Sequence, residues 1–226
     1  DAGGNASTHI CDIREEDQVC ATVEAILKTH NRIDYLVNNA GGQFSAPLEK
    51  ISAKGWDTVV RNNLTGGFLF ARECYRQWMK AQRGEGDHAI VNIIADMWHG
   101  MPGMGHSGAA RAGMLNFTET AALEWAPIRI NAVAPGWIAS SGMDNYPPEM
   151  APLIKRLADY TPARRLGTES EVSAAIVFLL SPAAAFISGS CLRIDGAAPH
   201  AKRVWPEGGC GIGRAVLDGF RLAKVA

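Results

Sequence analysis

The sequence predicts an α/β protein with a doubly wound parallel sheet. Short apolar runs alternate with longer amphipathic segments, and the runs are apolar at every position rather than at every second one. Continuous apolar strands are typical of parallel sheets, which helices cover on both faces. The length of 226 residues fits one domain over 1–226, and the sequence contains no repeat and no linker that would divide it.

The first half of the chain predicts two helices, each followed by a strand. Asp12 and Glu15 have the spacing of a capping box, so a helix is expected to begin there. The apolar run 33–37 predicts a buried strand that leads into the loop Asn-Asn-Ala-Gly-Gly. Ser52 is the expected N-cap of a long amphipathic helix over 52–81, and the run 90–94 predicts the second strand.

The second half continues the alternation around one long irregular segment. A Gly- and Met-rich loop precedes a helix over 107–125, and the run 128–133 predicts the third strand. The proline-containing segment 137–166 is expected to form a substrate loop with a short helix. Thr168 and Glu171 have capping-box spacing for the next helix, and 191–194 predicts the last strand. The tail 197–226 is expected to form a loop and a terminal helix.

Composition argues against several classes of function. Lys plus Arg number 22 and Asp plus Glu number 23, so the net charge of −1 provides no basic excess for binding nucleic acid. The longest apolar stretch, 174–180, is too short to span a membrane, and the first ten residues do not resemble a signal peptide. Five scattered cysteines without a CxxC pair predict neither disulfides nor zinc. His99 and His106 lack enough partners for a metal site. We therefore expect a cytoplasmic protein without a metal.

Three unusual loops follow three of the predicted strands. They are Asn-Asn-Ala-Gly-Gly after the first strand, Asp96 and the Gly-Met loop after the second, and Ala-Pro-Gly after the third. Ligands of parallel sheets bind beyond the carboxyl ends of the strands, so these loops are expected to form one crevice.

Several residues near this crevice have two interpretations. Asn63 lies in the apolar stripe of its helix, where a buried amide either ties the helix to backbone or holds a catalytic group or water. Asp96 is either a loop cap or a catalytic carboxylate. Methionines either line an apolar acyl pocket or belong to the core; these are Met97, Met101, Met104 and Met114.

Spaced motifs over most of the chain resemble the short-chain dehydrogenase/reductase superfamily. They are LVNNAGG at 36–42, NNLTGGF at 62–68, SGAARAG at 107–113, RINAVAPG at 129–136 and IDG at 194–196. The resemblance runs from Cys11 to about Gly196 and implies a Rossmann-like sheet. Within the superfamily, GGQF, HSGAARAG, ALEW and the WPEGG of the tail resemble peroxisomal trans-2-enoyl-CoA reductases, with 2,4-dienoyl-CoA reductases as relatives.

The resemblance implies a nicotinamide dinucleotide, NADP with NAD as the alternative, and assigns residues to it. Asn39, Ala40 and Gly41 would line its adenosine-ribose side, and Asp12 with Ile13 would lie near the adenine. The nicotinamide carboxamide would be held by a segment containing Pro135, Gly136 and Ile138. The helices over 52–81 and 107–125 resemble the pair through which the superfamily forms homotetramers.

Two positions depart from the superfamily and shape the expected chemistry. Its usual Tyr-x-x-x-Lys is replaced here by Ser107 and Arg111. A serine is a poorer proton donor to an alkoxide than a tyrosine activated by lysine, and arginine binds but does not relay protons. Reduction of a C=C bond in an acyl-CoA-type substrate needs only hydrogen-bond donors at the thioester oxygen and a weak acid. We assign Asn63, Asp96, Ser107 and Arg111 to the catalytic set, with Arg111 also binding the cofactor.

Two other functions stay open. One is an alcohol or ketone dehydrogenase of a terpenoid or 3-hydroxyacyl substrate, which would need another acid such as Tyr146 or Tyr160. The other is a non-catalytic scaffold protein. A further departure is that the superfamily's Gly-rich phosphate turn is not found before Cys11, and the glycines at 209–215 have no strand before them. The chain thus lacks the first βαβ unit, and we expect the native protein to carry it.

Overall fold

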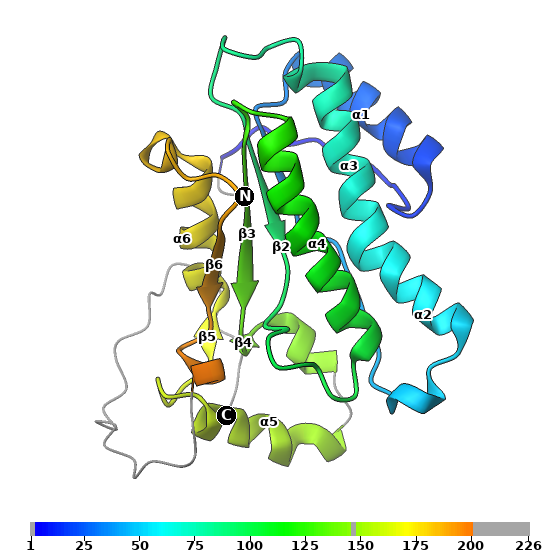
Figure 1. The fold of residues 1–226 in the computed structure, drawn as a ribbon, viewed down its shortest axis with the longest axis vertical. Helices are drawn as coiled ribbons and strands as arrows, with labels where there is room; N and C mark the ends of the chain where they lie inside the picture. Colours follow the sequence, from blue (N-terminus) through cyan, green and yellow to red (C-terminus); the bar gives the residue numbers. More distant parts are fainter. Residues whose placement is uncertain (1–2, 146–147, 201–226) are drawn as a thin grey trace.

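A computed structural model describes residues 3–145 and 148–200 of the chain. Four parallel strands form the main sheet in the order β1-β2-β3-β6 (Figure 1). Their bounds are β1 Tyr35–Asn38, β2 Ala89–Ile93, β3 Arg129–Pro135 and β6 Cys191–Ile194. Beyond β3, two short strands, β4 (Ile138–Ala139) and β5 (Gly167–Thr168), pair in parallel as a second sheet. The predicted parallel α/β architecture is confirmed.

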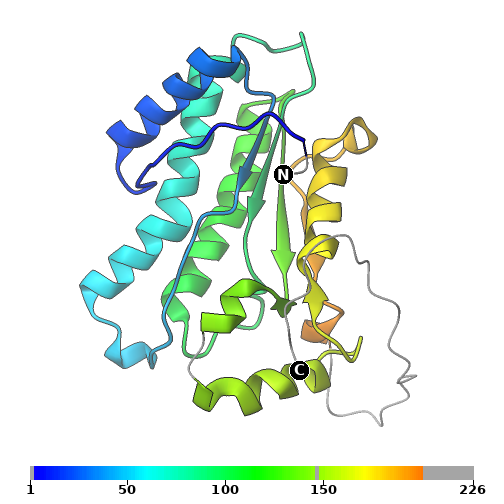
Figure 2. The same ribbon diagram turned by 180° about the vertical axis from the view of Figure 1, so that it is seen from behind.

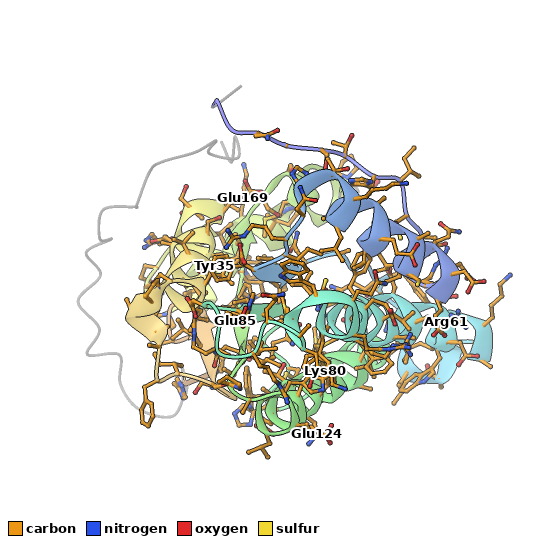
Figure 3. All side chains as sticks on the ribbon, turned by 90° about the horizontal axis from the view of Figure 1, so that it is seen from above. Tyr35, Arg61, Lys80, Glu85, Glu124 and Glu169 are labelled. Carbon is orange, nitrogen blue, oxygen red and sulfur yellow. The ribbon has the colours of Figure 1, made fainter. Side chains whose placement is uncertain are left out.

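Helices cover the main sheet on both faces. Helices α3 (Gly66–Cys74) and α4 (Gly105–Glu124) pack against one face, and α6 (Glu169–Leu180) packs against the other. Figure 3 looks along the strands and shows this layering. Helix α1 (Glu16–His30) packs on α3, and α5 (Ala151–Leu157) lies beyond the carboxyl ends of the strands (Figure 2). Among the described residues, no helix is long and apolar enough to cross a membrane.

The long predicted helix over 52–81 is built from four consecutive segments. Helix α2 (Ala53–Val60) begins at Ser52, whose side chain accepts the N–H of Gly55 at 3.1 Å as predicted. A π-helical turn, Arg61–Thr65, joins α2 to α3, and a second, Tyr75–Met79, follows α3. Wider turns of this kind are frequent at functional sites, and the first of them contains Asn63.

The predicted capping box at the first helix is wrong. Helix α1 begins one residue after Glu15, which makes no side-chain cap bond. The carboxylate of Asp12 instead binds the guanidinium of Arg14, with Oδ2 2.6 Å from Nη2. A charged partner two residues away competes successfully for the oxygen that would cap the helix. The capping box of Thr168 and Glu171 at α6, in contrast, is present.

The first strand lies at the edge of the sheet and is less buried than predicted. Tyr35 and Val37 are 43% and 39% exposed, whereas Leu36 packs in the core with Ile90. Alternate side chains point to opposite faces of a strand, so the exposed pair lies on the face that α6 covers farther along the sheet (Tyr35 is labelled in Figure 3). At β1 no described helix covers that face.

Two asparagines, the half-buried Asn38 and the fully buried Asn92, fix the register of the edge strand β1 on β2. Asn38 and Asn92 lie opposite each other, and Nδ2 of Asn38 donates to Oδ1 of Asn92 at 2.8 Å. Nδ2 of Asn92 in turn donates to the hydroxyl of Thr118 on α4 at 2.9 Å. Because each buried polar group has a partner, this chain of bonds stabilises one alignment of β1, β2 and α4. The carboxyl ends of the strands then meet at one edge, the lower end in Figure 1.

The connections between the helices and strands contain short 3-10 turns. Residues 137–166, predicted as an irregular loop with a short helix, hold β4, α5 and three such turns. The turns of the described chain are Leu48–Lys50, Ser141–Asn145, Pro148–Met150, Ala158–Tyr160, Pro182–Ala184 and Ala198–His200. The terminal helix predicted in the tail falls at residues 201–226, outside the described residues.

Candidate active site

The loop after β1 is tied to the π-helical turn by Asn63. This buried side chain donates through Nδ2 to the carbonyl oxygens of Gly42 at 2.7 Å and Val59 at 2.9 Å. Its Oδ1 accepts the backbone N–H of Gly42 at 3.3 Å. The amide is thus occupied by backbone groups, which is the structural one of its two interpretations. The exposed Asn39 and Ala40 precede this point on the same loop.

Arg111 lies beside the same loop. Its Nη1 donates to the carbonyl oxygen of Ile93 at 2.7 Å, while Nε is buried without a hydrogen-bond partner among the described residues. A Cβ atom at Gly41 would lie 2.7 Å from Oδ1 of Asn63 and 2.9 Å from Nη2 of Arg111, so a side chain does not fit there. Burial lowers the pKa of Arg111 to about 10, and the guanidinium stays charged at neutral pH.

Ser107 is fully buried in the first turn of α4. Its hydroxyl donates a hydrogen bond to Oε1 of Gln43, and its backbone N–H donates to Nδ1 of His106 at 2.9 Å. The buried ring of His106 meets the ring of Phe44 edge to face, with 4.6 Å between their centroids. Two side chains of the loop after β1, Gln43 and Phe44, therefore pack over the first turn of α4.

Asp96 follows β2 and faces the next strands of the sheet. Its backbone N–H donates to the carbonyl oxygen of Pro135 at 3.3 Å, and its Oδ1 lies 3.8 Å from Nη2 of Arg193 on β6. Burial raises the pKa of Asp96, and the charge of Arg193 opposes that rise. The guanidinium of Arg193 also lies over the ring of Trp98, 4.4 Å from its centroid, and donates to Asp195 at 2.9 Å.

The end of β3 packs closely on the end of β6. A Cβ atom at Gly136 would lie 2.9 Å from Cα of Asp195, so the two strand ends meet only because residue 136 is glycine. Ile138 pairs with Gly167 in the small sheet. A pocket of about 310 Å³ opens beside these strand ends. Its walls are formed by Trp137, Thr161, Ala163, Arg165, Gly167, Glu171 and residues 193–197.

Asp12 and Ile13 lie apart from these contacts, before α1. The ion pair with Arg14 holds the pKa of Asp12 at about 2. Ile13 packs on α3, where a Cβ atom at Gly66 would lie 2.7 Å from Cδ1 of Ile13. The structure therefore brings Gly41, Asn63 and Arg111 together, and no described contact joins Asp12 or Ile13 to them.

Two of the four methionines belong to the core. Met114 is buried in a core cluster with Ile94, Ala132 and Ala134, and Met97 packs against that cluster. The side chain of Met101 instead lies over Gly108, next to Ser107. Within residues 3–145 and 148–200, no three acidic, histidine or cysteine side chains gather as a metal site.

Two residues of the site escaped the sequence interpretation. In the sequence, Gln43 is part of the GGQF motif and Arg193 is part of a predicted strand, and neither pattern assigns the residue a role. Each acts on a partner far away in the sequence, Gln43 on Ser107 and Arg193 on Asp96. Two features of the sequence could have indicated these residues. Gln43 is a polar residue next to a double glycine, and Arg193 is an arginine inside an apolar strand.

Comparison with known proteins identifies the family. A family model described as enoyl-(acyl carrier protein) reductase matches residues 1–197. The chain belongs to this family of short-chain dehydrogenase/reductases. It is 36% identical over 197 residues to a probable 2,4-dienoyl-CoA reductase of Bacillus subtilis strain 168, covering 85% of this chain and 76% of that one. It is also 36% identical to a 3-oxoacyl-[acyl-carrier-protein] reductase of Synechocystis sp. PCC 6803, covering 86% and 76%.

A solved structure is more similar still in sequence. The citronellol catabolism dehydrogenase of Pseudomonas aeruginosa PAO1 is 55% identical, with a TM-score of 0.74, and the match covers 87% of this chain and 74% of that one. The chain thus spans about three quarters of these relatives. It is an oxidoreductase of the short-chain family, whose members use nicotinamide cofactors.

Proposed function

We propose that the protein reduces the C=C bond of an α,β-unsaturated thioester such as a 2-enoyl-CoA. The observation that carries the proposal is the hydrogen bond from the fully buried Ser107 to the exposed Gln43, at the place where the superfamily has a catalytic tyrosine. The hydroxyl of Ser107 donates to a carboxamide oxygen, which resembles a thioester carbonyl in shape and polarity. A substrate carbonyl that replaces Gln43 would accept the same hydrogen bond.

This pair suits the reduction of a polarised double bond. When the β-carbon of an enoyl thioester gains a hydride, negative charge develops on the thioester oxygen as an enolate. A donor held in a water-poor place stabilises that charge without having to lose its own proton. Ser107 meets this need, because packing in the first turn of α4 fixes its position and leaves it fully buried.

The residues around Gly41 fit a nicotinamide dinucleotide. Gly41 presents bare backbone beside the charged Arg111. The Nε–H of Arg111 has no partner among the described residues and could donate a hydrogen bond to a ribose hydroxyl. The cofactor supplies the hydride when it is bound. Asn63 positions the loop by holding Gly42, and Arg111 contributes positive charge at the crevice. NADP, rather than NAD, follows from the resemblance to enoyl-CoA reductases.

A second candidate function is dehydrogenation of an acyclic terpenoid alcohol. It is favoured by the 55% identity to the citronellol catabolism dehydrogenase. This reaction needs a group that takes the alcohol proton, a weak role for serine. Tyr160 is one of the two tyrosines proposed to take this proton, and its hydroxyl lies 2.8 Å from Nη2 of Arg156. The other, Tyr146, lies outside the described residues.

A substrate panel decides between the two functions. NADPH and NADH oxidation would be followed with crotonyl-CoA and longer 2-enoyl-CoAs, and NAD(P)⁺ reduction with citronellol and geraniol. Turnover of the enoyl-CoAs supports the proposal, and turnover of the alcohols alone refutes it. We expect Ser107→Ala to lower kcat about 100-fold, as for loss of one oxyanion donor. The control Ser181→Ala removes an exposed hydroxyl that caps α6 and should leave kcat unchanged.

A further inference from the structure

Arg193 joins the last strand of the sheet to the loop that leads into α4. It lies on β6, opposite Ala134 of β3, and its guanidinium reaches back across the strand ends to Trp98 and Asp96. Both of these residues belong to the segment that follows β2. The same segment ends at Met104, whose carbonyl oxygen accepts the N–H of Gly108 at 3.0 Å in the first turn of α4. A continuous path therefore leads from Arg193 to the turn that holds Ser107.

Two complementary atoms on this path face each other without hydrogen-bond partners. Within the described residues, Nη2 of Arg193 and Oδ1 of Asp96 are both buried and both unsatisfied. They are 3.8 Å apart, too far for a hydrogen bond. The pair therefore interacts as two charges, and because the side chains are 24% and 27% exposed, solvent screens part of their attraction.

The surroundings of Asp96 make Arg193 its main counter-charge. Burial raises the pKa of Asp96, and nearby Asp195 raises it further. Arg193, His99 and the backbone N–H of Trp98 act in the opposite direction, and Arg193 is the largest of these three. Asp195 is itself bonded to Nε of Arg193 at 2.9 Å, so one guanidinium serves both carboxylates. Removing it would leave two acidic groups near each other in a partly buried place.

We propose that Arg193 is a positioning residue of the crevice, which keeps Asp96 ionised and holds the loop of residues 97–104 through the ring of Trp98. In this role Asp96 is a hydrogen-bond acceptor, and the proton that completes the proposed reduction comes from another group or from water. The inference rests on the proposed function for its kinetic consequences alone. The charge state of Asp96 is independent of which substrate the protein uses.

The pH dependence of turnover tests the electrostatic role. In Arg193→Gln the midpoint on the acid side of the kcat/KM–pH profile should shift to higher pH by about one unit or more, because the carboxylate of Asp96 loses its counter-charge. Arg193→Lys should restore most of the shift, since lysine keeps the positive charge. Asp96→Asn combined with Arg193→Gln should abolish the shifted limb. A residue that matters only for packing would lower kcat/KM at every pH and leave the limb in place, which would refute the inference.

A second measurement needs no turnover. Carbon-13 NMR of protein labelled at aspartate carboxyl groups, with Asp96→Asn for assignment, follows the ionisation of Asp96 directly. The pH midpoint of Asp96 should be higher in Arg193→Gln than in the unmodified protein. The matched control is Arg32→Gln, which removes the arginine of an exposed pair with Asp34 and should not move the signal of Asp96. An unchanged midpoint in Arg193→Gln overturns the inference. Failure with every enoyl-CoA would instead refute the proposed function alone.

Discussion

Two arginine–aspartate pairs lie at opposite ends of the same sheet and differ in how fully they are bonded. At the amino end, Arg129 of β3 makes three hydrogen bonds of 2.9–3.1 Å to Asp87. It also donates to the carbonyl oxygens of Leu179 and Leu180 at the end of α6. At the carboxyl end, Arg193 of β6 and Asp96 keep 3.8 Å between two unsatisfied atoms.

The two pairs have different roles: the pair at the amino end stabilises the fold, and the pair at the carboxyl end belongs to the proposed site. The amino-end pair is fully satisfied and locks α6 to the sheet, as a buried charge requires. The carboxyl-end pair lies where three strand ends form the crevice, and it leaves bonding capacity unused. Unsatisfied buried groups reduce stability, so their presence at this end fits a place where ligands bind.

Breaking the amino-end pair should have the largest effect on the molecule. Arg129→Leu removes the charged partner of Asp87, to which the hydroxyl of Tyr35 still donates, and it removes the donors to the end of α6. It should therefore lower the free energy of unfolding by roughly 3 kcal/mol. Urea unfolding measures the change. Arg193→Leu is the comparison at the other end, and it should cost less than half as much. Equal losses at the two ends would contradict the distinction drawn between them.

The amino end and the helices were the more predictable part of the molecule. The strands over 90–94 and 191–194, the N-cap at Ser52 and the capping box at α6 all follow from local patterns. Two errors arose where the surroundings of a residue differ from what the local pattern implies. Arg14 took the carboxylate of Asp12, and the edge position of β1 left Tyr35 and Val37 exposed.

The site was only half predictable, for a physical reason. Ser107 and Arg111 stand out because they replace two residues of a known spacing. Gln43 and Arg193 gain their importance from partners 64 and 97 residues away, which no local pattern reveals. The π-helical turn at Asn63 was also hidden, because its amide bonds to Val59 and Gly42 only once the loop has folded back.

Arg111 differs from both Arg129 and Arg193, because it has no carboxylate partner in the described part of the chain. It bonds to the carbonyl of Ile93 and keeps Nε unsatisfied beside Gly41. Arg111→Ala should weaken cofactor binding about tenfold, the loss of one charge-assisted hydrogen bond. Fluorescence titration with NADPH measures it. Arg83→Ala, on the surface between Tyr75 and the end of α4, is the control and should leave the affinity unchanged. A normal affinity in Arg111→Ala would remove it from the cofactor site.

The smallest expected effect is on the free energy of unfolding when Asp96 is replaced. The sign of this change distinguishes the carboxyl end of the sheet from the amino end. Because burial raises the pKa of Asp96 in the fold, ionising it opposes folding, and this cost appears as the pH rises through the folded pKa. Asp96→Asn should therefore slightly increase the free energy of unfolding at pH 7. This gain in stability should vanish near pH 3, where the aspartate of the unmodified protein is neutral, as the asparagine of the variant is at every pH. Asp57→Asn, on the exposed face of α2, should show no such gain. A loss of stability at pH 7 in Asp96→Asn would mean that the carboxyl-end pair stabilises the fold in the way that Arg129 and Asp87 do.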